Sequence, residues 1–398
     1  MDAESPRRSA GLHAPTHGRT GRPLRIAWFG HAEGRRADGL STYTREMVAA
    51  LRGRGAEVQT FVHEADGQLG DDDHDVALKA LRFKTLTVSL LGSTERIAAA
   101  LDEFAPDLVH VSWSFGTLDG EIGRMARERG AATVATFHVP YAMGSVRAAV
   151  LRGLYRFHAR NLQEFDRCVA LSQDQADLLA EAGYAAERLV VIHNGVDTEV
   201  YAPGPSPLKA ELDADTVVAY MGRLDPEKRV PHLIRSFLAA GLGERTVLVI
   251  AGGGAQERRV RRLADGHDNV RVLGVVTDPQ RRLDLLRGAD VYVLPSTAEG
   301  LALSLLEAMS CGLAVTATDA GEDGEALEGA GVLLPVQPLE PSLGDALRRL
   351  CGDPGLRSQL GALARRRVEE RYGLHGNVDR LLGVYTELVE RAAAAVAG

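Results

Sequence analysis

Short apolar runs alternate with amphipathic stretches along most of this chain. The alternation is typical of βα units that wind a parallel sheet covered by helices on both faces. Leu24–Phe29 has the composition of a buried strand, and Leu40–Arg54 is predicted as a helix because apolar side chains recur along it at four-residue spacing. Further elements of the first half are expected at Val58–His63, Asp107–Trp113, Ala132–His138, Cys168–Ser172 and Leu189–His193 as strands and Glu121–Arg129 as a helix.

The segment Tyr201–Pro207 interrupts this alternation with three prolines and a glycine. That composition disfavours regular structure and predicts an interdomain linker. The alternation then restarts, and Asn377–Val396 ends it with apolar residues at helical spacing and no later strand, which predicts a closing helix. Strands of the second half are expected at Thr216–Met221, Thr246–Ala251, Val270–Leu273, Val291–Leu294 and Leu313–Thr318.

The pattern therefore predicts an α/β protein with two Rossmann-like, doubly wound domains that face each other across a cleft. The expected domains are residues 23–200, joined by a closing helix at 376–396, and residues 214–375, with the linker at 201–213. Residues 1–22 lack the apolar segment of a signal peptide and are expected to be a disordered leader. Ligands of open α/β sheets bind outside the carboxyl ends of the strands, so a two-substrate transfer would suit such a cleft.

The composition of the chain argues against several classes of function. The chain has 398 residues, 45% of them hydrophobic and 25% charged, which is the usage of a soluble globular protein. A net charge of −8 argues against nucleic-acid binding, which needs a basic surface. Cys168, Cys311 and Cys351 are far apart, so no disulfide framework or zinc site is indicated and a cytoplasmic location is expected. No apolar run of about 18 residues occurs, so no membrane span is expected.

The segment Pro295–Gly312, PSTAEGLALSLLEAMSCG, follows an expected strand and opens an expected helix. Two carboxylates, Glu299 and Glu307, flank the point where the helix begins; one can hold a sugar and the other a ribose through vicinal hydroxyls. The alternative is that Glu299 caps the helix and Glu307 is a solvated residue on its face. An anion-favouring pocket would be formed between them by the free backbone N–H groups of Gly300, Leu301, Ala302 and Leu303.

The segment Gly222–Lys228, GRLDPEK, ends the first strand after the linker. Gly222 is expected at the substrate, Arg223 offers a planar fork suited to phosphate, and Lys228 offers a compact ammonium. Together the two cations can stabilise the charge that grows on a departing nucleotide diphosphate. The alternative is a pair of solvated loop cations.

These two segments resemble the motifs of family 4 glycosyltransferases, PSxxEGxxLxxLEAMxxG and GRLxxxKG, with Arg229 where glycine is usual. The resemblance implies a GT-B fold in which Glu299 contacts the transferred hexose, residues 300–303 contact the phosphates or sugar, and Glu307 contacts the ribose. It also implies retaining transfer of a hexose-type sugar from a nucleoside diphosphate sugar to a hydroxyl of a small-molecule, glycoconjugate or lipid acceptor. We expect no cofactor and no essential metal.

The first domain offers weaker motifs. Gly39 enters the first helix and allows close backbone approach, in a loop that resembles the two-glycine loop of the family with Asp38 in place of one glycine; a packing turn is the alternative. His138 ends an expected strand where the family has a TxH element at the sugar or acceptor site; a structural histidine is the alternative. Ser172 and Asn194 follow later strands and are expected to contribute to substrate binding.

Other patterns are set aside or stay open. Asp213–Asp215 adjoins the linker and Asp71–Asp75 is interpreted as an exposed acidic loop, so neither is expected to be a metal site. Neither Gly30–Gly34 nor Gly252–Gly254 spells the GxGxxG of a nicotinamide or flavin site. Val146–Arg167 carries arginines among apolar residues, as in a helix at an anionic membrane surface or in an ordinary solvated helix.

Two other functions fit the same motifs. A GT-B epimerase or hydrolase would form product from the donor alone, and a non-catalytic protein would bind a sugar nucleotide without turnover. A composition rich in Ala, Arg and Gly is typical of a bacterial source with a GC-rich genome. The base, the sugar, the acceptor and the oligomeric state are left open by these residues.

Overall fold

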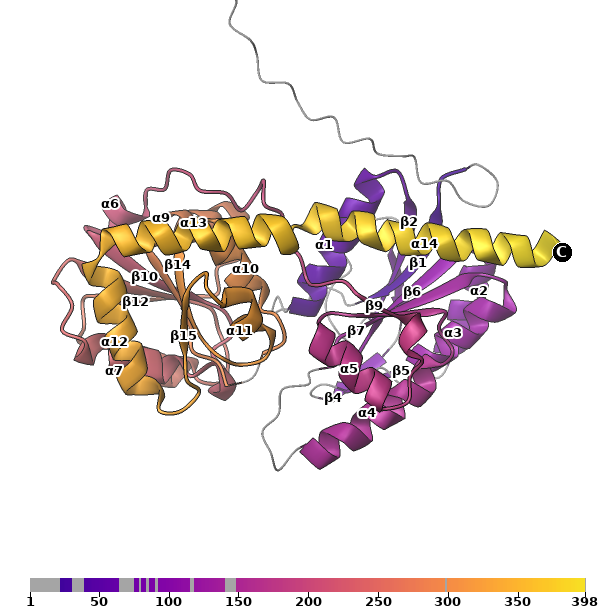
Figure 1. Ribbon diagram of the computed structural model, residues 1–398, viewed down its shortest axis with the longest axis horizontal. Helices are drawn as coiled ribbons and strands as arrows, with labels where there is room; N and C mark the ends of the chain where they lie inside the picture. Colours follow the sequence, from indigo (N-terminus) through magenta and orange to yellow (C-terminus); the bar gives the residue numbers. More distant parts are fainter. Residues whose placement is uncertain are drawn as a thin grey trace, which may run out of the picture. The chain divides into compact units, whose positions relative to one another are not determined.

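The computed structural model describes residues 22–30, 39–63, 75–78, 80–83, 86–89, 92–114, 118–139, 148–297 and 299–397. Strands and helices alternate through both halves of the chain, as the apolar pattern predicts (Figure 1). The expected leader up to residue 21, residue 38, residues 71–74 of the acidic segment and residues 146–147 of the basic segment lie outside the described residues.

The first half builds a seven-stranded sheet in the order β3-β2-β1-β6-β7-β8-β9. Its strands are β1 (Arg25–Gly30), β2 (Glu57–His63), β3 (Asp75–Leu78), β6 (Leu108–Trp113), β7 (Ala132–Phe137), β8 (Arg167–Ala170) and β9 (Leu189–Val191). Pairings of β1 with β2 and β6, of β2 with β3 and of β6 with β7 are parallel. An antiparallel pair, β4 (Ala80–Phe83) and β5 (Leu86–Ser89), was not anticipated from the sequence, and neither was β3.

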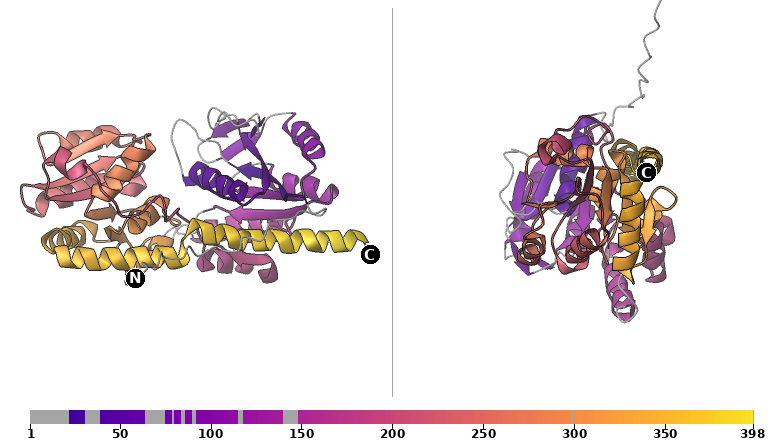
Figure 2. Two further views of the ribbon diagram at one scale, coloured as in Figure 1. Left: turned by 90° about the horizontal axis from the view of Figure 1, so that it is seen from above. Right: turned by 90° about the vertical axis from the view of Figure 1, so that its left-hand side faces the viewer.

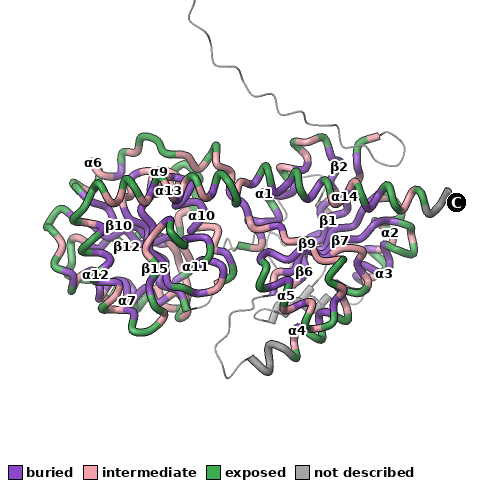
Figure 3. Tube along the Cα trace, in the orientation of Figure 1, coloured by how far each residue is buried: buried purple, intermediate pink, exposed green. Residues whose placement is uncertain are grey.

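The helices of this half are α1 (Gly39–Gly53), α2 (Ser93–Phe104), α3 (Asp119–Glu128), α4 (Ala148–Leu162) and α5 (Gln173–Glu181), with a 3₁₀ turn at Ala186–Arg188. The predicted apolar stripe of α1 is confirmed, because Tyr43, Met47 and Leu51 are all buried. The central strands β1, β6 and β7 are buried at almost every position, and exposed residues gather on the helices and connections (Figure 3).

The second half builds a six-stranded, fully parallel sheet in the order β12-β11-β10-β13-β14-β15. Numbered from its own first strand, this is 3-2-1-4-5-6, the order of Rossmann-like nucleotide-binding sheets. Its strands are β10 (Thr216–Met221), β11 (Thr246–Ala251), β12 (Val270–Gly274), β13 (Val291–Leu294), β14 (Ala314–Thr318) and β15 (Val332–Leu334).

Helices cover this second sheet, with α7 packed against α12 and α13 packed against α10 and β14. Their bounds are α6 (Leu208–Leu212), α7 (Val230–Ala239), α8 (Glu257–Ala264), α9 (Pro279–Gly288), α10 (Leu303–Ser310), α11 (Glu322–Leu327), α12 (Leu339–Gly352) and α13 (Pro354–Arg371). The short helix α6 occupies the second half of the expected linker, and its Leu208 is buried in the core of this sheet.

The described chain forms two compact units. One contains the described parts of Met1–Phe137 with Leu162–Cys168 and Val378–Gly398; the other contains those of His138–Asn161 and Val169–Asn377. The last helix, α14 (Leu374–Ala397), lies alongside strands of the first sheet (Figures 1 and 2). Its Tyr385 hydroxyl is 2.6 Å from His110 Nδ1 on β6, a hydrogen bond that fixes the helix on that sheet. No described helix is long and apolar enough to cross a membrane.

The strand order of the second sheet reverses between β10 and β13, which lie side by side. Ligands of open α/β sheets bind at such switch points, outside the carboxyl ends of the strands. The segment Gly222–Lys228 follows β10, and Pro295–Glu299 follows β13. The fold therefore brings the two motif-bearing segments to one edge of one sheet.

Candidate functional site

Two buried tyrosines and a glycine shape the loop after β10. The Tyr292 hydroxyl donates to the carbonyl of the last β10 residue over 2.9 Å, and the Tyr220 hydroxyl donates to the Arg223 carbonyl over 2.6 Å. Gly252 has φ +141°, and a Cβ at that position would lie 1.8 Å from the Gly222 carbonyl oxygen. Only glycine tolerates both this positive φ and this close approach. The GGG turn after β11 therefore packs directly against the backbone that carries Arg223.

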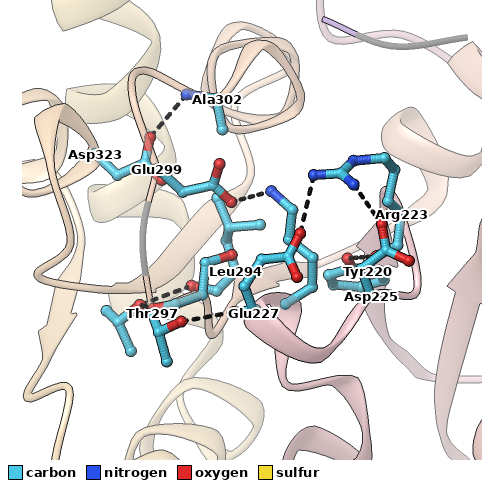
Figure 4. Close-up of polar contacts among 12 residues, drawn as sticks. Tyr220, Arg223, Asp225, Glu227, Leu294, Thr297, Glu299, Ala302 and Asp323 are labelled. Atoms are coloured by element: carbon cyan, nitrogen blue, oxygen red, sulfur yellow. Dashed lines mark hydrogen bonds and ion pairs between the residues drawn. The ribbon is translucent and has the colours of Figure 1, made fainter. Parts of the chain in front are cut away.

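Arg223 is held by two acidic neighbours from its own loop (Figure 4). Its Nη1 pairs with the Asp225 carboxylate, and its Nη2 donates to Glu227 Oε1 over 3.0 Å. The side chain is 50% exposed. Arg223 is therefore as exposed as the alternative of a solvated loop cation requires. An anion that binds it would have to compete with the two carboxylates.

Lys228 is not a solvated cation. Its ammonium forms an ion pair with the Glu299 carboxylate, and the two side chains are only 12% and 11% exposed (Figure 4). The Thr297 N–H donates to the Glu227 carbonyl over 2.8 Å, which joins the loop after β13 to the loop after β10. The two motif-bearing segments are therefore in direct contact.

Arg229 explains how this chain dispenses with the usual glycine. Its backbone is left-handed, with φ 55° and ψ 28°, a conformation that glycine adopts without strain and other residues rarely adopt. The side chain is buried, and its Nη1 donates to the Val336 carbonyl over 2.8 Å. The arginine therefore keeps the turn that glycine would form and adds a hydrogen bond to the chain after β15.

We expect Arg229→Gly to be more stable than Arg229→Ala by about 1 kcal/mol in urea unfolding, because both lose the bond to Val336 and only alanine keeps a Cβ in the left-handed region. The exposed Arg259 within α8 gives a control of opposite sign, since alanine stabilises a helix interior by about 1 kcal/mol over glycine. Equal stability of the two Arg229 variants would contradict the strain assigned to this turn.

The start of α10 is set by an aspartate that the sequence analysis missed. Ala302 is the residue before the helix, so Glu299 does not occupy the capping position. Asp323 Oδ1 accepts the Ala302 N–H over 2.8 Å (Figure 4). The expectation of a free N–H at Ala302 is therefore wrong. Burial, and then the nearby Glu299 charge, raise the pKa of Asp323 well above its usual range and favour its protonated form.

Glu307 lies within α10 and is 3% exposed, so it is not a solvated helix-face residue. Its two carboxylate oxygens accept from Arg282 Nη2 on α9 over 3.2 and 3.3 Å. Arg282 was not anticipated, because no motif marks it and only the packing of α9 brings it to Glu307. The pair fixes the orientation of a carboxylate that the sequence assigns to ribose binding.

Ser172 and Asn194 lie beside the same part of the chain. The Ser172 hydroxyl caps α5 by accepting the Gln175 N–H over 3.2 Å, and it also hydrogen-bonds with the Glu322 carboxylate. Asn194 Nδ2 donates to the Leu301 carbonyl over 3.2 Å. The structure therefore brings these two predicted residues to the segments that follow β13 and β14.

Gly39 and His138 lie at a helix start and a strand end in the first half of the chain. Gly39 is exposed and begins α1; a Cβ added there would meet no atom within 4 Å among the placed residues, so packing against these does not require glycine. His138 is half-buried and directly follows β7. The next carbonyl, that of Val139, accepts from the Tyr155 hydroxyl over 3.1 Å, which fixes the end of the strand.

Asp213 and Asp215, which were not expected to bind a metal, form surface ion pairs. Asp213 and Asp215 both contact Arg245, over 2.7 and 3.0 Å, and all three side chains are exposed. Within the part of the chain that the structure describes, no group of three or more His, Cys, Asp or Glu side chains is arranged to hold a metal ion. The three cysteines are free thiols.

Comparison with known proteins places the chain in a family. A sequence model of Glycosyltransferase Family 4 matches residues 37–200, and one of Glycosyl transferases group 1 matches residues 215–353. The D-inositol 3-phosphate glycosyltransferase of Saccharomonospora viridis is 32% identical, over 88% of this chain and 89% of that protein. The chain belongs to glycosyltransferase family 4. The enzyme of the same name from Acidothermus cellulolyticus is 30% identical, over 94% of this chain and 90% of that protein.

Solved structures confirm the predicted GT-B fold for this family 4 glycosyltransferase. Sucrose-phosphate synthase from Thermosynechococcus elongatus superposes with a TM-score of 0.73 at 21% identity, over 92% of this chain and 100% of that one. Anabaena HepE in complex with UDP superposes with a TM-score of 0.74 at 18% identity, over the same shares. HepE has also been solved in complex with UDP-glucose.

Proposed function

We propose that this family 4 glycosyltransferase moves a hexose-type sugar from a nucleoside diphosphate sugar to a hydroxyl of a small-molecule, glycoconjugate or lipid acceptor, with retention of configuration and without a metal. The observation that carries the proposal is the buried Lys228–Glu299 pair, with Arg223 on the same loop as Lys228, at the switch point of the second sheet. Cations and hydroxyl-binding carboxylates are the groups that a sugar diphosphate needs.

In this proposal the diphosphate lies against Arg223 and Lys228, the hexose is held by Glu299, and Glu307 accepts from the ribose hydroxyls. Gly39 and His138 are proposed for the acceptor side. UDP is the nucleotide to test first, because the HepE structures contain UDP and UDP-glucose. D-inositol 3-phosphate is the acceptor to test first, because the relatives are named for it.

The proposed step breaks the bond between the anomeric carbon and the diphosphate oxygen while a bond forms from the acceptor oxygen to the same face of that carbon. The acceptor proton passes to an oxygen of the leaving phosphate, so no protein nucleophile is needed. Negative charge grows on the diphosphate, and Arg223 and Lys228 stabilise it. Lys228 is expected to stabilise this charge more strongly than the exposed Arg223, because water is largely excluded around its ammonium.

The test is incubation of the purified protein with UDP-glucose, with and without D-inositol 3-phosphate and a panel of other polyols and glycolipids. The proposal predicts UDP release that depends on an acceptor, and a product whose anomeric proton shows the donor's configuration by NMR. Sugar release or epimerised donor without acceptor would identify a hydrolase or epimerase. Binding of donor without any turnover would identify a non-catalytic protein.

Glu227→Gln is expected to raise the affinity for UDP by about 2- to 5-fold, since an exposed ion pair contributes roughly 0.2–1 kcal/mol and the diphosphate competes with it for Arg223. Isothermal titration calorimetry measures the change. Glu257→Gln is the matched control, because Glu257 pairs with an exposed arginine of α8, Arg261, and is expected to leave UDP affinity unchanged. A Glu227→Gln variant with wild-type affinity would contradict the competition.

A further inference from the structure

A buried carboxylate beside the motif segments has no role in the function proposed so far. Glu322 begins α11 and is only 5% exposed, and its Oε2 has no hydrogen-bond partner among the residues that the structure describes. Its carboxylate hydrogen-bonds with the Ser172 hydroxyl, which can donate only one hydrogen. Buried polar atoms are nearly always hydrogen-bonded in folded proteins, so an oxygen left over at this depth indicates a missing donor.

The residues on either side of Glu322 place it against the Glu299 segment. Gly321 has φ +67°, and a Cβ there would lie 2.0 Å from the Glu299 carbonyl oxygen, so the two backbones are in direct contact. Asp323 accepts the Ala302 N–H over 2.8 Å. Glu322 therefore lies between two residues that contact the segment assigned to the hexose.

The surroundings of Glu322 do not compensate its charge. Burial raises the pKa of its carboxyl, the hydrogen bond from Ser172 lowers it, and the charges of Glu325 and Asp174 raise it; together they move the pKa from the usual 4.5 to about 7. The folded state binds the proton more tightly than the unfolded state, so stability falls as the pH rises from 4.5 toward 7. The fold thus carries an ionisable group that weakens it at neutral pH.

We propose that Glu322 is a specificity-determining residue whose Oε2 accepts a hydrogen bond from a hydroxyl of the transferred sugar, beside Glu299. The inference rests on the function proposed above. A sugar hydroxyl supplies the donor that this oxygen lacks, and a carboxylate accepts such a bond more strongly than a neutral group. A donor sugar without that hydroxyl would leave the oxygen buried and unsatisfied, so the residue would discriminate against deoxy sugars.

The experiment compares UDP with UDP-glucose by isothermal titration calorimetry, because the two ligands differ only in the sugar. Glu322→Ala is expected to weaken UDP-glucose binding by about 10- to 100-fold and to leave UDP binding within about twofold, as loss of one charge-assisted hydrogen bond predicts. Glu322→Gln, which keeps the side-chain volume, is expected to give an intermediate loss. Glu328→Ala is the control, because Glu328 is an exposed acidic residue at the other end of α11.

The melting temperature of a Glu322 variant shows whether Glu322 serves ligand binding or the stability of the fold. Removing a buried and uncompensated carboxylate is expected to keep or raise the melting temperature of Glu322→Gln at pH 8, whereas a structural residue would lower it. Equal affinities of wild type and both Glu322 variants for UDP-glucose, or equal losses for UDP and UDP-glucose, would overturn the inference alone. A wild-type protein that binds neither ligand would overturn the proposed function, and this inference with it.

Discussion

Lys228→Ala is expected to lower the rate of sugar transfer at saturating donor by about 100- to 1000-fold, the usual effect of removing one group that stabilises transition-state charge. Lys228 is the cation that lies buried against Glu299, where low water content strengthens its interaction with a departing diphosphate. The same substitution leaves the buried Glu299 carboxylate without this ammonium. Initial rates with UDP-glucose and the acceptor found in the panel measure the effect.

Lys209→Ala is the matched control for this prediction. Lys209 also forms a lysine–carboxylate pair in the same unit, with Asp290 over 2.7 Å, but it is 41% exposed and lies away from both motif segments. Its variant is expected to keep the wild-type rate within about twofold, since exposed pairs contribute little. Lys228→Arg keeps the charge and is expected to recover part of the rate. A Lys228→Ala enzyme whose transfer rate stays within about threefold of the wild-type rate would contradict the assigned role.

Glu307→Ala is expected to weaken UDP binding by about 10- to 100-fold, because a carboxylate bonded to vicinal hydroxyls makes charge-assisted hydrogen bonds. Glu307 is almost fully buried and Arg282 holds both of its oxygens, so its geometry is fixed before the ligand binds. The variant also removes a carboxylate from beside a largely buried guanidinium, and we expect its free energy of unfolding to fall as well. Titration calorimetry with UDP measures the first effect and urea unfolding the second.

The variant Arg282→Ala tests whether Arg282 acts only by orienting Glu307 and not by contacting UDP itself. It leaves Glu307 in place and removes the group that orients it, so a smaller loss of UDP affinity than in Glu307→Ala is expected. Glu370→Ala, a change of an exposed acidic residue of α13, is expected to leave both quantities unchanged. Wild-type UDP affinity in Glu307→Ala would contradict the assignment of this residue to the nucleoside.

The central strands of the second sheet could be predicted from the sequence almost to the residue. β10, β11 and β13 are buried on both faces, so each is a nearly continuous apolar run, and glycine or proline follows each of them. β15 was missed because it has three residues, two of them not buried, at the edge of the sheet. Short edge strands carry too little apolar pattern to be distinguished from loops.

The candidate site was predicted where its residues are consecutive and missed where packing joins distant segments. Motif spacing pointed to Lys228 and Glu299, and their contact follows from β10 and β13 being neighbours. Nothing in the sequence marks Arg282, Glu322 or Asp323, because their roles depend on how α9 and α11 pack. The expected free N–H of Ala302 was wrong for the same reason, because its acceptor, Asp323, comes from α11.

The central claim is that this chain binds a nucleoside diphosphate sugar at the switch point of its second sheet. The most direct measurement is thermal unfolding of wild type and Glu307→Ala with UDP, GDP, ADP and dTDP and their sugars, because a ligand that binds only the folded state raises the melting temperature. The account predicts that one nucleotide family stabilises the wild type and that the stabilisation is lost in Glu307→Ala. A folded wild-type protein whose melting temperature none of these ligands changes would contradict it.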